Sequence, residues 1–227
     1  LDMELDRPEG KCTLMVDFSP RQRTYALDPE FEAEALSAFS DAGIRTVKLD
    51  FDMPFNTPKC KKLVSGIKKF LMKRISSSPK FPLYSCASAS RFPEKAKDAR
   101  EEAANLWARP VEFRRTVEKM YEDGFRVFLE VGPRGLMTSA VEDTLKGRQF
   151  AAIATNSTHR TSKLQSLHAI GQLIALGADI NCSIFYPDSS RKIDFDSAVS
   201  LEVRKDVMMK LSRTFPKMTL LGEDVSF

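Results

Sequence analysis

Residues 105–136 read NLWARPVEFRRTVEKMYEDGFRVFLEVGPRGL, and this stretch decides the fold. Pro110 begins an amphipathic segment typical of a helix, which ends at Gly124. The continuous apolar run that follows, Phe125–Val131, is the pattern of a parallel strand covered on both faces. The next four residues, GPRG, turn the chain at the carboxyl end of that strand, where open α/β sheets place ligands. We therefore predict a helix, a central buried strand, and a turn in which Gly132, Pro133 and Arg134 line a cleft.

Helices and strands alternate on both sides of this stretch. Apolar periodicity predicts further helices over Lys59–Ser76, Pro93–Leu106, Leu136–Lys146 and Thr161–Leu176. Short runs of strand-forming residues predict strands over Phe81–Cys86 and Ala151–Thr155. Such alternation is typical of an α/β core with a parallel sheet.

The amino-terminal part has a different pattern. Lys11–Phe18 and Arg23–Leu27 predict two strands, and a helix capped by Asp28 follows and ends at Gly43. Ile44–Phe51 alternates like a third strand. Strand, strand, helix and strand within so short a segment predict a small α+β unit of ferredoxin-like type over residues 11–55.

Composition narrows the class of protein. The 227 residues are 42% hydrophobic and 29% charged with a net charge of +4, which favours a globular protein and gives little support to nucleic-acid binding. The sequence has no apolar run of the ~18–20 residues that a membrane-spanning helix needs. Four scattered cysteines and only two histidines argue against disulfides and metal sites. We expect a cytoplasmic location, reduced thiols, no metal, and no nucleic-acid or membrane partner.

Several familiar catalytic motifs are absent from these residues. There is no glycine-rich nucleotide loop, and no G-x-S-x-G elbow in which a serine could act as a nucleophile. The two histidines, His159 and His168, are isolated and are more typical of structural residues than of catalytic ones. The polar residues 1–10 are typical of a linker, as is the weakly patterned segment 187–227.

A basic run lies between the two parts of the chain. Residues 59–80 hold eight lysines and arginines and no acidic residue. A solvated helix face explains this run most simply. The alternative is a docking surface for an acidic partner, with Lys68 and Lys69 at its centre.

The segment around Pro110 and the EVGP turn together resemble the malonyl/acyl-transferase family. Family members carry a proline-led helix of the form xxPVxF and then a buried strand ending in EVGP, which here are Arg109–Phe113 and Phe128–Pro133. EVGPRG and the later SKLQSLHAIGQLIALG resemble the iterative type I synthases of polyunsaturated fatty acids and enediyne polyketides. The resemblance covers about residues 11–186. It implies a ferredoxin-like subdomain followed, over residues 56–186, by the carboxyl-terminal part of a hydrolase-like α/β core.

The resemblance also implies a reaction and its partners. In the family, a serine takes the acyl group from coenzyme A and passes it to the phosphopantetheine thiol of an acyl carrier protein. No cofactor is bound, since acyl-coenzyme A and the phosphopantetheine arm are substrates. The carrier protein and neighbouring synthase domains such as a ketosynthase would be the partners.

This chain departs from the family at two catalytic positions. The family's elbow, G-H-S-x-G, is not in these residues. The turn that carries the family's basic histidine matches Pro54–Pro58, and the histidine position holds Asn56. The resemblance places Asn56 beside the backbone carbonyl of Leu106. An asparagine can orient a hydroxyl but cannot take its proton at neutral pH.

Two hypotheses follow from these departures. The chain is either part of a synthase acyltransferase whose serine half lies outside these residues, or a non-catalytic pseudo-acyltransferase that spaces domains or docks a carrier protein. An unrelated α/β domain that binds nucleic acid or an anionic membrane through residues 59–80 is a third interpretation. No aromatic-rich basic motif supports that third interpretation.

Overall fold

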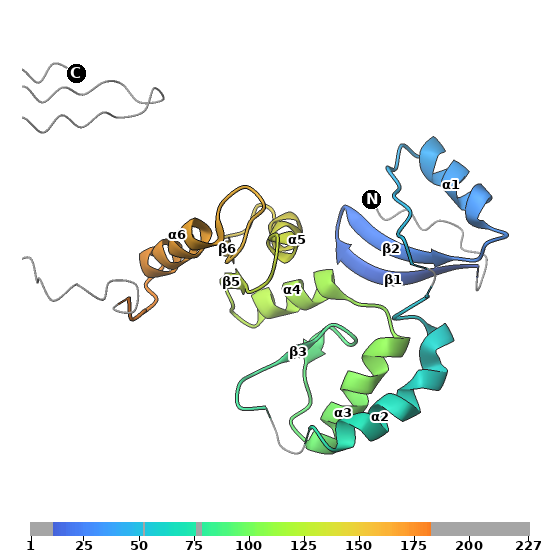
Figure 1. Cartoon of the computed structure of the whole chain (residues 1–227), viewed down its shortest axis with the longest axis horizontal. Helices are drawn as coiled ribbons and strands as arrows, with labels where there is room; N and C mark the ends of the chain where they lie inside the picture. The colour runs from blue at the N-terminus through green and yellow to red at the C-terminus, as the bar shows by residue number, and fades with distance from the viewer. Residues whose placement is uncertain (1–10, 52, 76–78, 183–227) are drawn as a thin grey trace, which may run out of the picture. The chain divides into compact units, whose positions relative to one another are not determined.

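The structure, a computed structural model, describes residues 11–51, 53–75 and 79–182. The first of these ranges contains the amino-terminal strands and helix. Strand β1 (Cys12–Ser19) pairs antiparallel with β2 (Gln22–Leu27). Helix α1 (Glu32–Asp41) follows (Figure 1). It buries Ala35 and Phe39. Gly43, with φ of 68°, ends this helix in the left-handed conformation that glycine adopts without strain. The linkers predicted at 1–10 and 187–227 lie outside the described residues.

Two predictions for this unit are wrong. Asp28 does not cap the helix, which begins at Glu32 after Phe31; its carboxylate instead pairs with Lys59. Ile44–Phe51 forms no strand, and its side chains are exposed. A strand needs a backbone partner as well as an alternating sequence, and within the described residues this segment has none.

The basic run and the segment before Pro110 form a helical layer. The 3₁₀ helix η1 (Pro58–Leu63) leads directly into α2 (Val64–Met72). Helix α3 (Ala96–Asn105) packs against α2 (Figure 1). The short 3₁₀ helix η2 (Leu106–Ala108) contacts η1. The sequence predicts one long helix over Lys59–Ser76. Proline at the start of η1 and the tighter first turn shorten the α-helical part.

A hairpin replaces the strand predicted over Phe81–Cys86. Only Tyr84–Ser85 (β3) is extended, and it pairs antiparallel with Ser90–Arg91 (β4) instead of joining the parallel sheet. Pro82 has no N–H to donate, which disfavours a longer central strand here. The hairpin is fastened to the end of α4 (Phe113–Glu122), where Asp123 accepts hydrogen bonds from Tyr84, Lys119 and Arg91.

This cluster makes stability depend on pH. The hydrogen bond from Tyr84 and that from Lys119 lower the pKa of Asp123 to about 2 from an ordinary value of 3.8. The stabilisation is therefore present above pH ~4 and is lost as the pH falls through ~2. We expect Asp123→Asn to lower the melting temperature at pH 7, and the difference from the parent to shrink between pH 4 and pH 2. A difference that stays constant over that range would contradict the assignment.

The carboxyl-terminal elements form the parallel α/β pair. Strand β5 (Val127–Glu130) pairs in parallel with β6 (Ala151–Ala154), and α5 (Leu136–Thr144) connects them. Helix α6 (Ser162–Ala175) follows (Figure 1). The side chain of Thr161 caps it by accepting from the N–H of Leu164. The core lies between α4, α5 and β5. Its buried residues are Val117, Val141 and Leu145, with Phe113, Tyr121, Phe128, Phe150 and Ala152 packed against them.

The prediction that Phe125–Val131 is central and covered on both faces is wrong for this chain. Phe128 packs on the core, whereas Val127 and Leu129 are exposed on the other side. Within the described residues, β5 pairs with β6 alone. The apolar run has the composition of an interior strand, but among the described residues neither a second layer nor a second neighbouring strand covers it.

No helix in the described part of the chain is long and apolar enough to cross a membrane. The four cysteines, all within the described residues, form no disulfide bond, and Cys60 is the buried one.

Candidate functional site

The turn that holds Asn56 is a strained backbone segment. Asn56 has φ of 57°, in the left-handed region that few residues other than glycine adopt. Its half-buried side chain donates from Nδ2 to the carbonyl oxygen of Leu106, at 2.6 Å. The two residues are far apart in sequence, and η2 brings them together by packing on η1. The structure therefore places Asn56 beside the Leu106 backbone, where the family resemblance puts it.

Hydrogen bonds made by the residues next to Asn56 hold the turn in place. Thr57 is fully buried, and its Oγ1 donates to the carbonyl oxygen of Pro54 at 2.7 Å. The Sγ of Cys60 lies 3.3 Å from the same oxygen, and the Cys60 N–H donates to the Thr57 carbonyl. A strained residue persists only where its surroundings over-determine it. Asn56 is thus held in one orientation by the fold.

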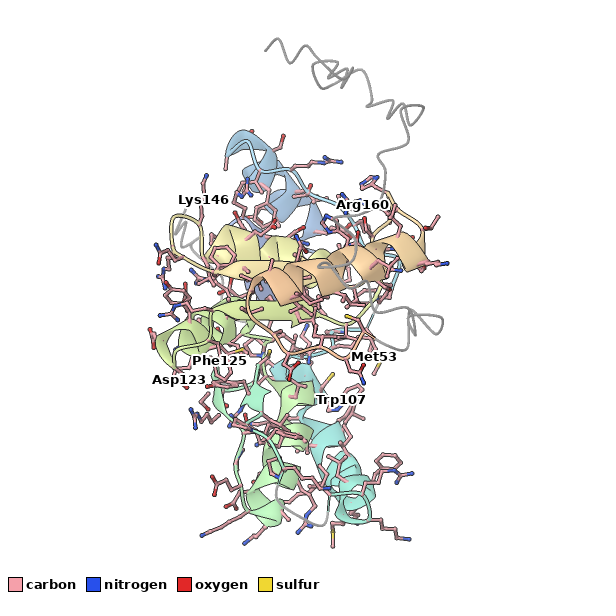
Figure 2. All side chains as sticks on the ribbon, turned by 90° about the vertical axis from the view of Figure 1, so that its left-hand side faces the viewer. Met53, Trp107, Asp123, Phe125, Lys146 and Arg160 are labelled. Atoms are coloured by element: carbon pink, nitrogen blue, oxygen red, sulfur yellow. The ribbon has the colours of Figure 1, made fainter. Side chains whose placement is uncertain are left out.

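Aromatic rings support the turn from the side. The ring of Phe55 lies 6.0 Å from that of Phe51 and 6.3 Å, edge to face, from that of Trp107. Figure 2 labels Met53, which begins the turn, and Trp107. In the sequence, Trp107 stands out only as part of a motif, and its contact with Phe55 is not predicted from it. The signal that could have predicted this contact is the position of an aromatic residue directly after Leu106, whose carbonyl accepts the hydrogen bond from Asn56.

The chemistry available at Asn56 follows from its hydrogen bond. With Nδ2 engaged at Leu106, the Oδ1 atom remains as an acceptor. It can align a hydroxyl group, but an amide oxygen does not bind the proton when that hydroxyl attacks. That Asn56 stands at the position of a general base stays a prediction from the family resemblance.

The second predicted element is the turn after β5. Arg134 is exposed and left-handed with φ of 74°, and its N–H donates to Asn156 Oδ1 at 3.2 Å. Gly135 is also left-handed, and a Cβ there would lie 3.2 Å from the Cβ of Ala154, so glycine is needed at this position. Glu130 fastens the turn to α5 by accepting from both the N–H and the Oγ1 of Thr138.

The structure does not join this turn to Asn56. Within the described residues, no hydrogen bond or ring contact connects Gly132, Pro133 or Arg134 with Asn56 or Leu106. Their placement in one cleft therefore stays a prediction.

The basic run divides into paired and solvent-facing lysines. Lys68 forms an ion pair with Glu101 of α3 at 2.8 Å, and Lys59 pairs with Asp28. Lys69 and Lys73 are exposed. They share one helix face with Gly66 and Phe70, since these four residues follow the i, i+3, i+4, i+7 spacing.

A groove of about 360 Å³ opens on this face. It is almost entirely apolar and is lined by Gly66, Ile67, Phe70, Leu71, Ala103 and Trp107. The groove thus runs from α2 to the residue that follows Leu106. Arg74 stacks on Phe70, with the guanidinium carbon 3.7 Å from the ring centre.

Other candidate nucleophiles and ligands are not arranged for chemistry. Burial raises the pKa of the Cys86 thiol, which keeps it protonated and unreactive at neutral pH. His159 and His168 are both exposed, on a loop and on α6. Among residues 11–51, 53–75 and 79–182, no three His, Cys, Asp or Glu side chains gather closely enough to hold a metal ion.

Comparison with known sequences points to large synthases. No family model matches the chain. It is 31% identical over 176 residues to 6-methylsalicylic acid synthase of Penicillium patulum, a match that covers 76% of this chain and 10% of the relative. It is 27% identical over 142 residues to a polyunsaturated fatty acid synthase polypeptide of Thraustochytrium sp., covering 61% of this chain and 5% of the relative. The chain thus spans a tenth or less of these curated relatives.

Comparison with solved structures decides the fold. The acyltransferase domain from the second module of the salinomycin polyketide synthase matches with a TM-score of 0.69 at 16% identity, over 88% of this chain and 45% of that one. The fold is that of an acyltransferase domain. The malonyl CoA-acyl carrier protein transacylase of Clostridium perfringens matches with a TM-score of 0.61 at 20% identity, over 74% of this chain and 52% of that one.

A third structure with the acyltransferase fold includes a partner. It is a malonyl-transacylase in complex with a type II polyketide synthase acyl carrier protein, and it matches with a TM-score of 0.59 at 23% identity. The match covers 69% of this chain and 50% of that one. In all three comparisons, about half of the solved chain has no counterpart in the 227 residues of this chain.

Proposed function

We propose that the chain is the carboxyl-terminal half of a malonyl/acyl-transferase domain in an iterative type I synthase of the polyunsaturated fatty-acid or enediyne type. Its reaction would be the transfer of malonyl or other acyl groups from coenzyme A to the phosphopantetheine of an acyl carrier protein. The observation that carries the proposal is the hydrogen bond from Asn56 to the Leu106 carbonyl within an acyltransferase fold. Similarity to a polyketide synthase and to a polyunsaturated fatty acid synthase supports the class of synthase.

Each residue has a defined role under this proposal. Leu106 orients position 56 through its carbonyl, and Asn56 aligns the attacking hydroxyl. The hydroxyl itself comes from a serine elbow outside these residues, since they contain no G-x-S-x-G. The turn at Gly132, Pro133 and Arg134 would close the cleft at the carboxyl end of β5.

The test follows radiolabelled malonyl groups from coenzyme A onto protein and then onto a carrier protein. The 227-residue chain alone should form no stable covalent acyl adduct, because it has no serine in a G-x-S-x-G elbow. A polypeptide that unites it with an intact elbow should form one slowly. A stable adduct on the chain alone would refute the proposed division of roles.

Asn56 also supports a second candidate function. A chain that keeps the orienting hydrogen bond but has lost proton affinity is suited to a non-catalytic pseudo-acyltransferase, which spaces a ketosynthase and other neighbouring domains or docks a carrier protein. Absence of an elbow from the rest of the parent polypeptide would favour this function over the first.

Both candidates include a docking surface for an acidic carrier protein. We place it at the face of α2 that the exposed Lys69 and Lys73 share with Gly66 and Phe70, two of the residues that line the groove. Exposed lysines attract an acidic surface, and the apolar groove can take one apolar side chain of the partner. Lys68 contributes less, because its charge is already paired with Glu101.

We expect the double substitution Lys69→Glu and Lys73→Glu to weaken binding of the holo carrier protein of the same synthase about tenfold. Affinity of the parent chain should also fall as salt rises. Lys68→Gln is the matched control and should change affinity little. The measurement is isothermal titration calorimetry at low ionic strength. Equal losses in the control and the double variant would place the docking surface elsewhere.

A further inference from the structure

Asp17 is a buried carboxylate to which the proposed function gives no role. It lies in β1 and is only 4% exposed. Its Oδ1 accepts from the Nε of Arg23 at 3.1 Å, and its Oδ2 accepts from the Nε of Arg114 at 2.9 Å. A buried charge is costly unless it is paired and hydrogen-bonded, and the two arginines meet that need here.

The two arginines belong to different parts of the fold. Arg23 is in β2, the strand that pairs with β1, so its ion pair with Asp17 stays inside the hairpin. Arg114 is in α4, 97 residues further along the chain than Asp17. Of the two pairs, it is therefore the one with Arg114 that joins the hairpin to a helix.

The backbone of β1 also holds the segment just before α4. The N–H of Val111 donates to the carbonyl of Met15 at 2.8 Å, and the N–H of Asp17 donates to the carbonyl of Val111 at 2.9 Å. The rings of Phe18 and Phe113 stack with their centres 5.1 Å apart. Strand β1 thus fixes the start of α4 through backbone, ring and charge together.

A short, stiff connector links the start of α4 to the Asn56 turn. Leu106, whose carbonyl accepts from Asn56, lies shortly before Val111 in the sequence. Arg109, between them, has extended backbone with φ of −125° and ψ of 151°, and Pro110 has its φ fixed by its ring at about −65°. A connector with so few free dihedral angles passes a displacement of Val111 on to the Leu106 carbonyl.

We propose that Asp17 is a positioning residue, whose ion pair with Arg114 sets the place of the Leu106 carbonyl and so holds the Asn56 side chain in one orientation. Asp17 acts through the start of α4 and the connector. The proposal rests on the proposed function only in treating Asn56 as part of the site, since the hydrogen bond itself is a feature of this chain.

Asp143 supplies the matched control. It is a second carboxylate that fastens the same hairpin to a helix, accepting from the Oγ of Ser19 at 2.7 Å and from the Nε of Arg21 at 2.6 Å. Its side chain is 9% exposed. Because Asp143 lies on α5, its loss loosens the hairpin without removing the ion pair to α4.

The test reads the Asn56 hydrogen bond by nuclear magnetic resonance on the full 227-residue chain. The side-chain amide proton that Asn56 donates to Leu106 should exchange slowly with solvent in the parent. Asp17→Asn keeps the side-chain shape and removes the charge, so exchange of that proton should become at least about tenfold faster. Asp143→Asn should leave the exchange rate within about twofold, although both variants lower the melting temperature.

Arg114→Gln removes the same ion pair from the α4 side. The Arg114 side chain is 26% exposed, which makes this the milder variant, and it decides the question if Asp17→Asn does not fold. It should reproduce the faster exchange of the Asn56 proton. Arg23→Gln, which breaks the pair inside the hairpin, should have a smaller effect.

Two results would overturn the proposal. Unchanged exchange in Arg114→Gln would show that the orientation of Asn56 does not depend on this ion pair. An equal rise in Asp143→Asn would show that it follows the general stability of the hairpin.

Acyl transfer is read separately, in the polypeptide that unites this chain with an intact elbow. There, Asp17→Asn should lower kcat and leave KM unchanged, because the variant disturbs the alignment of the hydroxyl and not the binding of substrate. Faster exchange of the Asn56 proton with an unchanged kcat would uphold the positioning and reject the proposed role of Asn56.

Discussion

We expect Asn56→His to raise acyl transfer by about 10²–10⁴-fold in a polypeptide that joins this chain to an intact serine elbow, because under the proposed function it supplies a proton acceptor. The backbone is ready for the change: histidine, like asparagine, is among the residues that adopt the left-handed conformation with φ of 57°. An imidazole N–H can donate to the Leu106 carbonyl as Nδ2 does now. Its second nitrogen is then free to take the proton of the hydroxyl.

Two controls define this experiment. Asn56→Gln keeps an amide and should give no gain, so that a gain in the histidine variant reflects proton transfer. Asn56→His in the 227-residue chain alone should leave it without a covalent adduct, because a base has no hydroxyl to activate. The measurement is the rate at which radiolabelled malonyl groups appear on the protein and then on the carrier protein. No gain from Asn56→His beside an intact elbow would favour the pseudo-acyltransferase.

Leu145→Ala is expected to destabilise the chain by about 2–5 kcal/mol, the range found for removing a fully buried leucine side chain. Leu145 is 0% exposed and lies in the cluster with Val117 and Val141, which joins α4, α5 and β5. Truncation leaves a cavity that these elements can fill only partly. Because β5 has one covered face, the cluster is its main attachment to the helices.

Urea unfolding followed by circular dichroism measures this loss as a shift of the transition midpoint. Leu164→Ala, on the exposed face of α6, is the matched control and should change stability by no more than ~0.5 kcal/mol. A loss below about 1 kcal/mol in Leu145→Ala would mean that this cluster is not the core that holds the parallel pair together.

Local sequence patterns predicted much of the secondary structure. Thr161 before an amphipathic segment predicted the start of α6, and Gly124 and Gly43, both at positive φ, predicted where α4 and α1 end. The family resemblance predicted that Asn56 lies beside Leu106, and these two residues do form a hydrogen bond. The catalytic role of that pair stays a prediction. Caps and turn residues act over a few positions, so their effect is visible in sequence.

Pairing and burial were decided by tertiary structure. Phe125–Val131 has the composition of an interior strand, and Ile44–Phe51 alternates like a strand, yet the first is exposed on one face and the second forms no strand. Likewise, only the fold pairs Lys68 with Glu101 and leaves Lys69 in solvent. Apolar composition determines which side chains stabilise the folded state when they are buried. Whether they are buried depends on a second surface, contributed by residues far away in sequence or by another half of the fold.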